Sequence, residues 1–281
     1  MRVDRRQFLE CALSLGALSM LPARAEGMQV MSKDIVMLHG ANAGGWCFDR
    51  FRAVFEGKGF TCHAPNLIGH GKDKANAATV LKGVGIAEYR AEIAAFVAQF
   101  PAPPILLGHS MGAVIAQLLA AQGQASALVL AAPAPRAGVL PQTALEKKLG
   151  RDLMSIGDLR NKVLDPIFEL AKIYTLNRLP ESEQRTVFDK FGPESGRALF
   201  ELFVWIFDET NATVVDTSAV RCPVLCLSGT DDRIVSLQTA RETAKAYPGA
   251  PFWELEGHGH MFLLEPGADA IAQRVAEWIP S

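Results

Sequence analysis

The chain has 281 residues, of which 49% are hydrophobic and 21% are charged, as is typical of a globular protein with a substantial core. Its formal net charge of −2 lacks the positive excess expected of a protein that binds nucleic acid or an anionic membrane surface. These two classes of partner are therefore excluded from the prediction.

Residues 1–25 carry the pattern of an export signal. The pair Arg5 and Arg6 precedes the apolar run CALSLGALSML, and Ala23-Arg24-Ala25 follows it. This order is typical of a cleaved signal, and the apolar run is too short to span a bilayer. The paired arginines resemble a twin-arginine signal, which exports folded bacterial proteins. We expect a periplasmic or secreted protein that begins at Glu26; the alternative is a helical extension that stays attached.

Short apolar runs recur along the rest of the chain, with helical segments between them. The runs begin at residues 35 (IVMLHG), 105 (ILLGHS), 127 (ALVLAAP), 223 (PVLCLSG) and 252 (FWELEGHGH). The predicted helices span roughly residues 46–57, 86–100, 111–122, 237–246 and 268–279. Strands that are apolar on both faces and alternate with helices predict a mostly parallel sheet between two helix layers, a doubly wound α/β fold.

Residues 136–220 interrupt this alternation. They contain no strand-like run, and several aromatic residues lie among helix-forming charged residues. The pattern predicts a helical cap inserted into an α/β core that residues 26–135 and 221–281 form together. We expect the aromatic residues mainly to form the core of the cap: Phe168, Phe188, Phe191, Phe200, Phe203, Trp205 and Phe207.

The stretch GHSMG at residues 108–112 places one serine between two glycines where an apolar run meets a predicted helix. A strand that becomes a helix within about one residue strains the central residue, and larger side chains at both glycine positions would collide. Such a turn presents the Ser110 hydroxyl at the helix N-terminus, where free N–H groups favour negative charge. Ser110 is the candidate nucleophile; the alternative is a tight turn with an incidental serine.

A serine hydroxyl becomes a strong nucleophile when a histidine takes its proton and a carboxylate orients that histidine. Such groups should follow later strands, because loops at the carboxyl ends of parallel strands meet in one crevice. Asp231 and Asp232 follow the run PVLCLSG, and His258 and His260 follow the last run. Chemistry alone permits either member of each doublet.

Four motifs in chain order resemble those of the α/β-hydrolase superfamily: LHGANAGGW at 38, GHSMG at 108, GTDDRIV at 229 and GHMFLLEP at 259. The resemblance covers essentially the whole chain after residue 25. It implies that Ser110 is the nucleophile, Asp232 the acid and His260 the base, with Glu265 five residues further on. It also implies an oxyanion hole formed by the backbone N–H groups of Ala41 and Met111.

The stretch HGANAGGWCFDRF is most similar to small esterases related to plant methylesterases and hydroxynitrile lyases. The lyases carry a lysine directly after the catalytic histidine, whereas this chain has Met261 there, as the esterases do. Asn66 stands where many relatives have an aspartate, and we interpret it as structural.

The cysteines predict neither a metal site nor a disulfide scaffold. They form no C-x-x-C pair or His/Cys cluster, so we expect buried free thiols, and pairing of Cys47 with Cys62 stays open. We expect four further histidines to support loops or to be structural: His39, His63, His70 and His109.

Together these features predict a serine hydrolase that cleaves carboxylic esters of small to medium apolar substrates through an acyl-enzyme, without a cofactor. Two alternatives, haloperoxidase-type perhydrolysis and C–C bond hydrolysis, would use the same three residues. A non-catalytic ligand-binding protein of this fold is the third alternative, and it would have lost a catalytic residue, whereas none is missing here.

Overall fold

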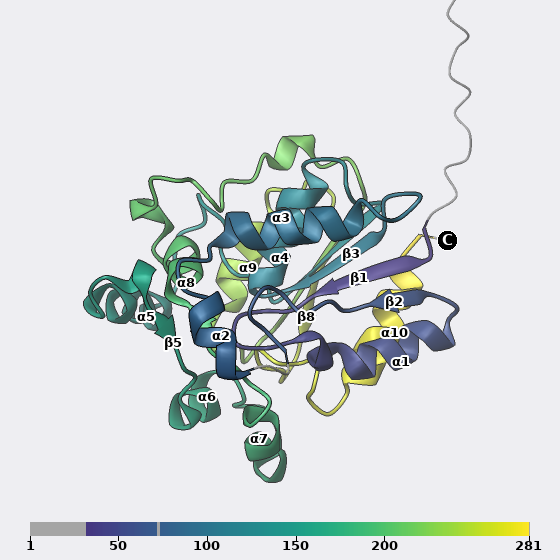
Figure 1. Ribbon diagram of the computed structural model, residues 1–281. Coiled ribbons are helices and arrows are strands. Elements are labelled where there is room, and N and C mark those ends of the chain that lie inside the picture. The colour runs from purple at the N-terminus through teal and green to yellow at the C-terminus, as the bar shows by residue number, and fades with distance from the viewer. Residues whose placement is uncertain (1–31, 72–73, 281) are drawn as a thin grey trace, which may run out of the picture. The chain divides into compact units, whose positions relative to one another are not determined.

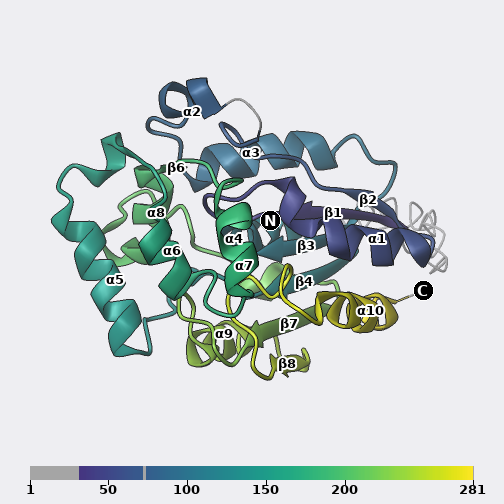
Figure 2. The same cartoon turned by 90° about the horizontal axis from the view of Figure 1, so that it is seen from below.

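The computed structural model describes residues 32–71 and 74–280, so the predicted export signal lies outside the described residues. The described part is built on a six-stranded sheet in the order β2-β1-β3-β4-β7-β8, in which every neighbouring pair is parallel (Figures 1 and 2). Its strands are β1 (Asp34–Leu38), β2 (Thr61–His63), β3 (Ile105–His109), β4 (Ala127–Ala131), β7 (Val224–Gly229) and β8 (Phe252–Leu255). Each of the five predicted apolar runs forms a strand, and the short edge strand β2 is the sixth.

Helices cover both faces of this sheet, which confirms the predicted doubly wound α/β class (Figures 1 and 2). One layer contains α1 (Asp49–Gly57) and α10 (Ala268–Trp278). The opposite layer contains α3 (Ile86–Val97), α4 (Met111–Ala120) and α9 (Leu237–Ala244), and α2 (Lys74–Val80) precedes α3. The predicted helices end within a few residues of these bounds.

The strands are continuously apolar because both of their faces are buried. On β1, Ile35 and Met37 pack with α1 and α10, whereas Val36 and Leu38 pack with α3 and α4. All four side chains are inaccessible to solvent. Successive strand residues point to opposite faces, so a sheet covered on both sides replaces the usual alternation of apolar and polar residues by an unbroken apolar run.

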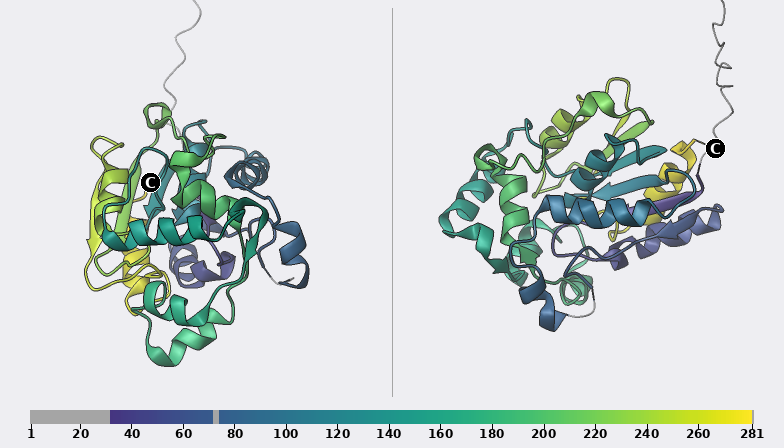
Figure 3. Two further views of the ribbon diagram at one scale, coloured as in Figure 1. Left: turned by 90° about the vertical axis from the view of Figure 1, so that its left-hand side faces the viewer. Right: turned by 45° about the horizontal axis from the view of Figure 1, so that its top comes forward.

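Residues 136–220, called the cap segment below, lie between β4 and β7 and group at one side of the sheet (Figure 3). Their helices are α5 (Ala144–Ser155), α6 (Phe168–Tyr174), α7 (Glu181–Phe188) and α8 (Gly196–Phe203). The expectation of no strand was wrong here, because β5 (Val163–Leu164) and β6 (Glu194–Ser195) pair antiparallel. Strands of two residues are too short to show a sequence period.

The aromatic residues of the cap segment divide between different environments. Phe168 and Phe188 pack edge to face with ring centroids 5.1 Å apart. Phe191, which also packs against Phe188, and Phe203 line the cavity described below, and Phe207 is 57% exposed. The expectation that these aromatics mainly form the core of the cap therefore holds only in part.

All four cysteines of the described residues are free, including Cys47 and Cys62. Cys47 and Cys226 are buried as expected, whereas Cys62 and Cys222 are only partly buried. Burial raises the pKa of Cys62 to about 11, so its thiol stays protonated at neutral pH. Within the described residues, no helix has both the length and the apolar character needed to cross a membrane.

Candidate active site

Ser110 occupies the tight turn between β3 and α4. Its backbone has φ 53° and ψ −117°, a region that residues other than glycine rarely adopt. Two hydrogen bonds hold it there, since the Ser110 N–H donates to the carbonyl of Ala131 at 3.0 Å and the Ala134 N–H donates to the carbonyl of Ser110 at 3.1 Å. The turn is therefore fixed by the end of β4 and by the loop that follows it.

The two glycines that flank Ser110 have no room for a side chain. A Cβ atom on Gly112 would lie 2.1 Å from the carbonyl oxygen of Leu38, and one on Gly108 would lie 2.4 Å from the carbonyl oxygen of Gly112. Real Cβ contacts do not reach such distances, so both positions require glycine. This agrees with the collision expected from the sequence.

His260 connects Ser110 to Asp232. Its Nε2 atom lies 3.1 Å from the Ser110 hydroxyl, and its Nδ1 atom lies 2.8 Å from Oδ2 of Asp232. A carboxylate only accepts hydrogen bonds, so Nδ1 carries the proton and Nε2 is free to accept from the hydroxyl. The N–H groups of Ile234 and Val235 donate to Oδ1 of Asp232 at 2.8 and 2.9 Å, which fixes the carboxylate.

The other members of the two doublets point elsewhere. The carboxylate of Asp231 lies 3.1 Å from Nε of Arg178 in the cap segment. Nδ1 of His258 lies 3.0 Å from Glu265, which also accepts the N–H of Gly259 at 3.0 Å. Glu265 therefore contacts His258 and the backbone before His260, and not the His260 ring with which the sequence motif associates it.

His39 and His109 hold neighbouring loops by hydrogen bonds, as expected, and the structure shows in addition that both rings are neutral. Burial, followed by a neighbouring histidine, lowers the pKa of each to about 3. The Nδ1–H of His39 donates to the carbonyl of Gly40 at 2.8 Å, while its Nε2 accepts the N–H of Leu67 at 3.0 Å. Nε2–H of His109 donates to the carbonyl of His260 at 2.9 Å, which holds the loop that carries this residue.

The predicted oxyanion donors Ala41 and Met111 both border the cavity beside Ser110. Met111 is the first residue of α4, where backbone N–H groups have no acceptor within the helix. Ala41 lies in a turn that the Ala43 N–H closes by donating to the carbonyl of Gly40 at 3.3 Å. The next residue, Asn42, has a left-handed φ of 61°.

The cap segment holds this turn through Gly192 and Glu194, which belong to none of the sequence motifs. Asn42 and Gly192 exchange two hydrogen bonds, one of 2.9 Å to the Asn42 carbonyl and one of 2.8 Å from its side-chain amide. The Asn42 N–H also points to the buried carboxylate of Glu194, at 3.3 Å. No local pattern marks Glu194, because its partners come from distant parts of the chain.

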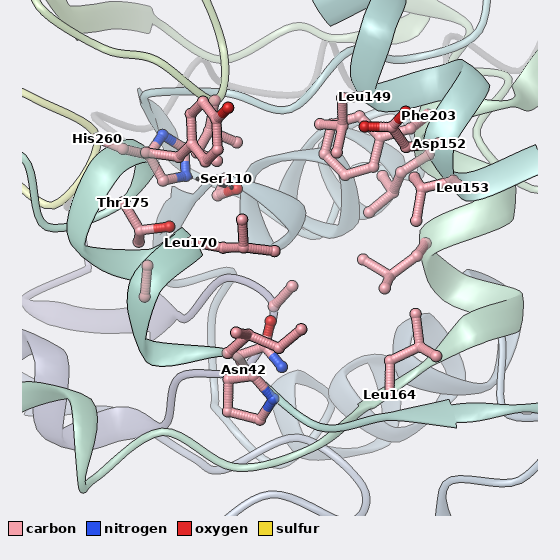
Figure 4. A pocket seen from close by; sticks show the side chains of 18 of the residues that line it. Asn42, Ser110, Leu149, Asp152, Leu153, Leu164, Leu170, Thr175, Phe203 and His260 are labelled. Atoms are coloured by element: carbon pink, nitrogen blue, oxygen red, sulfur yellow. Dashed lines mark hydrogen bonds between the residues drawn. The ribbon is translucent and has the colours of Figure 1, made fainter. Parts of the chain in front are cut away.

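Ser110 and His260 lie on one wall of a cavity of about 600 Å³ between the sheet and the cap segment, and Leu149, Leu153 and Phe203 face them across it (Figure 4). This volume suits a small to medium organic ligand. Most of the lining is apolar. The charged residues that line the cavity are exposed ones at its margin: Lys148, Asp152, Asp165 and Arg233.

A sequence model described as the alpha/beta hydrolase family matches residues 35–274. This match spans both the sheet and the cap segment. The chain belongs to the alpha/beta hydrolase family. The four sequence motifs, the strand order and the tight turn at Ser110 are therefore all features of this one family.

This α/β hydrolase is similar to proteins that act on esters or are named hydrolases. A pyrethroid hydrolase from Sphingobium wenxiniae is 28% identical over 227 residues, which cover 77% of each chain. The structure of a methylesterase from Arabidopsis has a TM-score of 0.64 and 15% identity, covering 88% of this chain and 99% of its own. That of a pyrethroid hydrolase from Sphingobium faniae has a TM-score of 0.63 and 21% identity, with coverages of 87% and 96%.

Within its described residues, this α/β hydrolase has no cluster of three or more His, Cys, Asp or Glu side chains able to hold a metal ion. The position after His260 is Met261, which is 2% exposed and packs in the apolar core. The hydrogen-bonded row of Ser110, His260 and Asp232 reaches the cavity wall through Ser110 and His260.

Proposed function

We propose that this α/β hydrolase is a serine esterase that cleaves carboxylic esters of small to medium apolar substrates through an acyl-enzyme. One observation carries the proposal: the hydrogen-bonded row of Ser110, His260 and Asp232 borders a largely apolar cavity. The names of its relatives, pyrethroid hydrolase and methylesterase, support the same class of reaction.

In the first half of the reaction, Oγ of Ser110 attacks the ester carbonyl carbon while its proton passes to Nε2 of His260. Asp232 stabilises the imidazolium that forms. The carbonyl oxygen becomes negatively charged and accepts hydrogen bonds from the N–H groups of Ala41 and Met111. When the tetrahedral intermediate collapses, the proton on His260 passes to the departing alcohol.

In the second half, a water molecule takes the place of the alcohol. His260 removes a proton from this water, whose oxygen attacks the acyl carbon. A second tetrahedral intermediate uses the same two N–H donors. Its collapse breaks the bond to Ser110, His260 returns the proton to Oγ, and the carboxylic acid leaves.

The cavity favours neutral substrates. Its wall opposite Ser110 is formed by apolar side chains such as Leu149, Leu153 and Phe203. An unpaired charge placed among them would lose its hydration without gaining a partner. Lys148 and Asp152, at the margin, already pair with each other.

The test is an activity profile with p-nitrophenyl esters of increasing acyl length, run on the wild type and on Ser110→Ala. We expect hydrolysis by the wild type and a loss of several orders of magnitude in kcat for the variant, with its fold retained. A fluorophosphonate should label Ser110 alone. Esterase activity that survives in Ser110→Ala, or labelling at another residue, would refute the proposal. Faster reaction with hydrogen peroxide or with diketones would favour perhydrolysis or C–C bond hydrolysis instead.

We further propose that the protein is exported by a twin-arginine route and acts in the periplasm or outside the cell. The support is the sequence order of paired arginines, apolar run and Ala23-Arg24-Ala25.

A further inference from the structure

We infer that Glu194 of the cap segment and His70 form a buried ion pair that positions the oxyanion turn, Gly40 to Ala43, for catalysis. The inference rests on the proposed esterase function and assigns positioning roles to both residues. Neither residue borders the cavity, so both would act through the backbone of the turn.

Glu194 is fully buried, and all of its acceptor positions are used. Oε1 accepts the Tyr89 hydroxyl at 2.7 Å and the Ser195 N–H at 2.7 Å. Oε2 accepts Nε2–H of His70 at 3.0 Å and the Asn42 N–H at 3.3 Å. The Tyr89 hydroxyl and the N–H groups of Ser195 and Asn42 are donors whatever the state of His70, and three such donors around one buried carboxylate favour its ionised form.

The surroundings of His70 require its charged form. Nε2 faces the carboxylate of Glu194, and Nδ1 lies 3.0 Å from the carbonyl oxygen of Ile68. Both partners only accept hydrogen bonds, so both ring nitrogens must carry protons. The side chains of His70 and Glu194 are inaccessible to solvent. Although burial alone would lower it, Glu194 raises the pKa of His70 above its usual value.

The ion pair reaches the site through Asn42. The Asn42 N–H belongs to the central peptide of the oxyanion turn, directly after Ala41, and Asn42 has the left-handed φ of 61° that asparagine tolerates in turns. Glu194 fixes the N–H of this residue, and Gly192 fixes its carbonyl and side chain. The orientation of the Ala41 N–H therefore depends on the carboxylate in the cap segment.

A matched control is present in the same cap segment. Glu201 on α8 is 1% exposed, accepts the N–H of Ile86 at 2.7 Å and pairs with Arg197 at 2.7 Å. Like Glu194, it ties the cap segment to the core by a buried carboxylate. Unlike Glu194, it has no contact with the oxyanion turn.

The experiment measures the rate at which a fluorophosphonate phosphonylates Ser110, together with kcat and KM on one p-nitrophenyl ester. In phosphonylation the bond from Oγ of Ser110 to phosphorus forms, the P–F bond breaks and fluoride leaves, while His260 takes the hydroxyl proton. The phosphoryl (P=O) oxygen occupies the oxyanion hole. The variants are Glu194→Gln, His70→Gln and the control Glu201→Gln, each checked for folding by circular dichroism and thermal unfolding.

We expect Glu194→Gln and His70→Gln to slow phosphonylation and lower kcat by at least about tenfold, with KM changed by less than about twofold, because oxyanion donors act mainly in the transition state. Glu201→Gln should stay within about twofold of the wild type in both rates. Glutamine at position 70 keeps a neutral donor and disturbs packing least, so His70→Gln decides the matter if Glu194→Gln does not fold.

Wild-type rates in both Glu194→Gln and His70→Gln would overturn the inference, and so would an equal loss in Glu201→Gln, which would reduce the role of these carboxylates to general stability. The proposed function is tested separately, by whether the wild type is phosphonylated at Ser110 at all. Phosphonylation of the wild type with no effect of the variants would reject the positioning role and leave the esterase proposal standing.

Discussion

Asp232 accepts a 2.8 Å hydrogen bond from Nδ1 of His260, and both side chains are almost completely buried. The adjacent carboxylate, Asp231, instead pairs with Arg178 of the cap segment. Two neighbouring aspartates of one loop therefore have separate environments: one faces the imidazole in the interior, and the other faces a guanidinium at the surface.

This division predicts opposite effects of matched substitutions in the two doublets. Asp232→Asn and His260→Ala should each remove most activity, the asparagine because it stabilises the wrong imidazole tautomer. Asp231→Asn and His258→Ala should keep at least about a tenth of it, a loss of at most about 1.4 kcal/mol in transition-state stabilisation. The measurement is kcat/KM of the four variants on one ester. An inactive His258→Ala with an active His260→Ala would reverse the assignment of the base.

The tight turn predicts a large loss of stability for Gly112→Ala. The added Cβ would meet the carbonyl of Leu38 on the neighbouring strand, so backbone must shift. We expect the free energy of unfolding to fall by about 1–3 kcal/mol or more, as in other overpacked cores. The matched control is Gly57→Ala at the end of α1, where an added Cβ meets nothing within 4 Å. Equal stability of both variants in urea unfolding would contradict the prediction.

The sequence predicts the parts of this molecule that depend on local pattern. Unbroken apolar runs mark five strands because those strands are buried on both faces, and the glycines around Ser110 mark a turn whose geometry excludes side chains. Loops after β1, β3, β7 and β8 meet at one edge of a parallel sheet, so the candidate residues could be expected to gather there.

The sequence does not predict the contacts that cap segment and core make with each other. Glu194 lies 124 residues from His70 and 105 residues from Tyr89, and no local period connects them. The pairing of Glu265 with His258 was missed for a different reason, since the motif spacing relates Glu265 to His260 and the loop turns it toward the other histidine. Strands β5 and β6 are too short for any pattern.

The cavity predicts that Leu149 limits the size of the substrate. It lies on the wall opposite Ser110, so Leu149→Trp should fill part of the space that a long acyl or aryl group would occupy. We expect kcat/KM for such an ester to fall at least about tenfold relative to the acetate. Leu140→Trp is the control, because Leu140 also belongs to the cap segment but is 53% exposed and does not line the cavity. An unchanged ratio in Leu149→Trp would place the acyl group elsewhere.

The N-terminal pattern predicts that Arg5→Lys with Arg6→Lys blocks export. Twin-arginine export depends on the arginine pair, whereas lysines keep the charge. We expect the double variant to accumulate uncleaved inside the cell while the wild type appears outside the inner membrane with Glu26 as its first residue. Cell fractionation with N-terminal sequencing measures both. Exported wild type that still carries Met1 would count against cleavage.

The ion pair between His70 and Glu194 predicts a stability that depends on pH. Although burial alone would raise it, the charge and hydrogen bond of His70 lower the pKa of Glu194, and Glu194 in turn raises that of His70. The other titratable groups around His70 are His39, which is neutral, Glu92 and Tyr89. Because the pKa of Glu194 is lowered on folding, its ionisation stabilises the folded protein at pH values above its unfolded pKa of about 4.3. Because the pKa of His70 is raised, its protonation stabilises the folded protein at pH values below its unfolded pKa of about 6.5.

The contribution of the ion pair to the free energy of unfolding should therefore be at its full value between about pH 4.3 and 6.5. It should decrease as pH rises through the raised pKa of His70, and also as pH falls through the lowered pKa of Glu194. The measurement is the free energy of unfolding in urea for the wild type minus that for His70→Gln, across this range and on its alkaline side. Because glutamine does not titrate, we expect the difference to be largest near about pH 5.5 and to shrink in alkali. A difference that stays constant into alkali would mean that His70 is neutral in the folded protein.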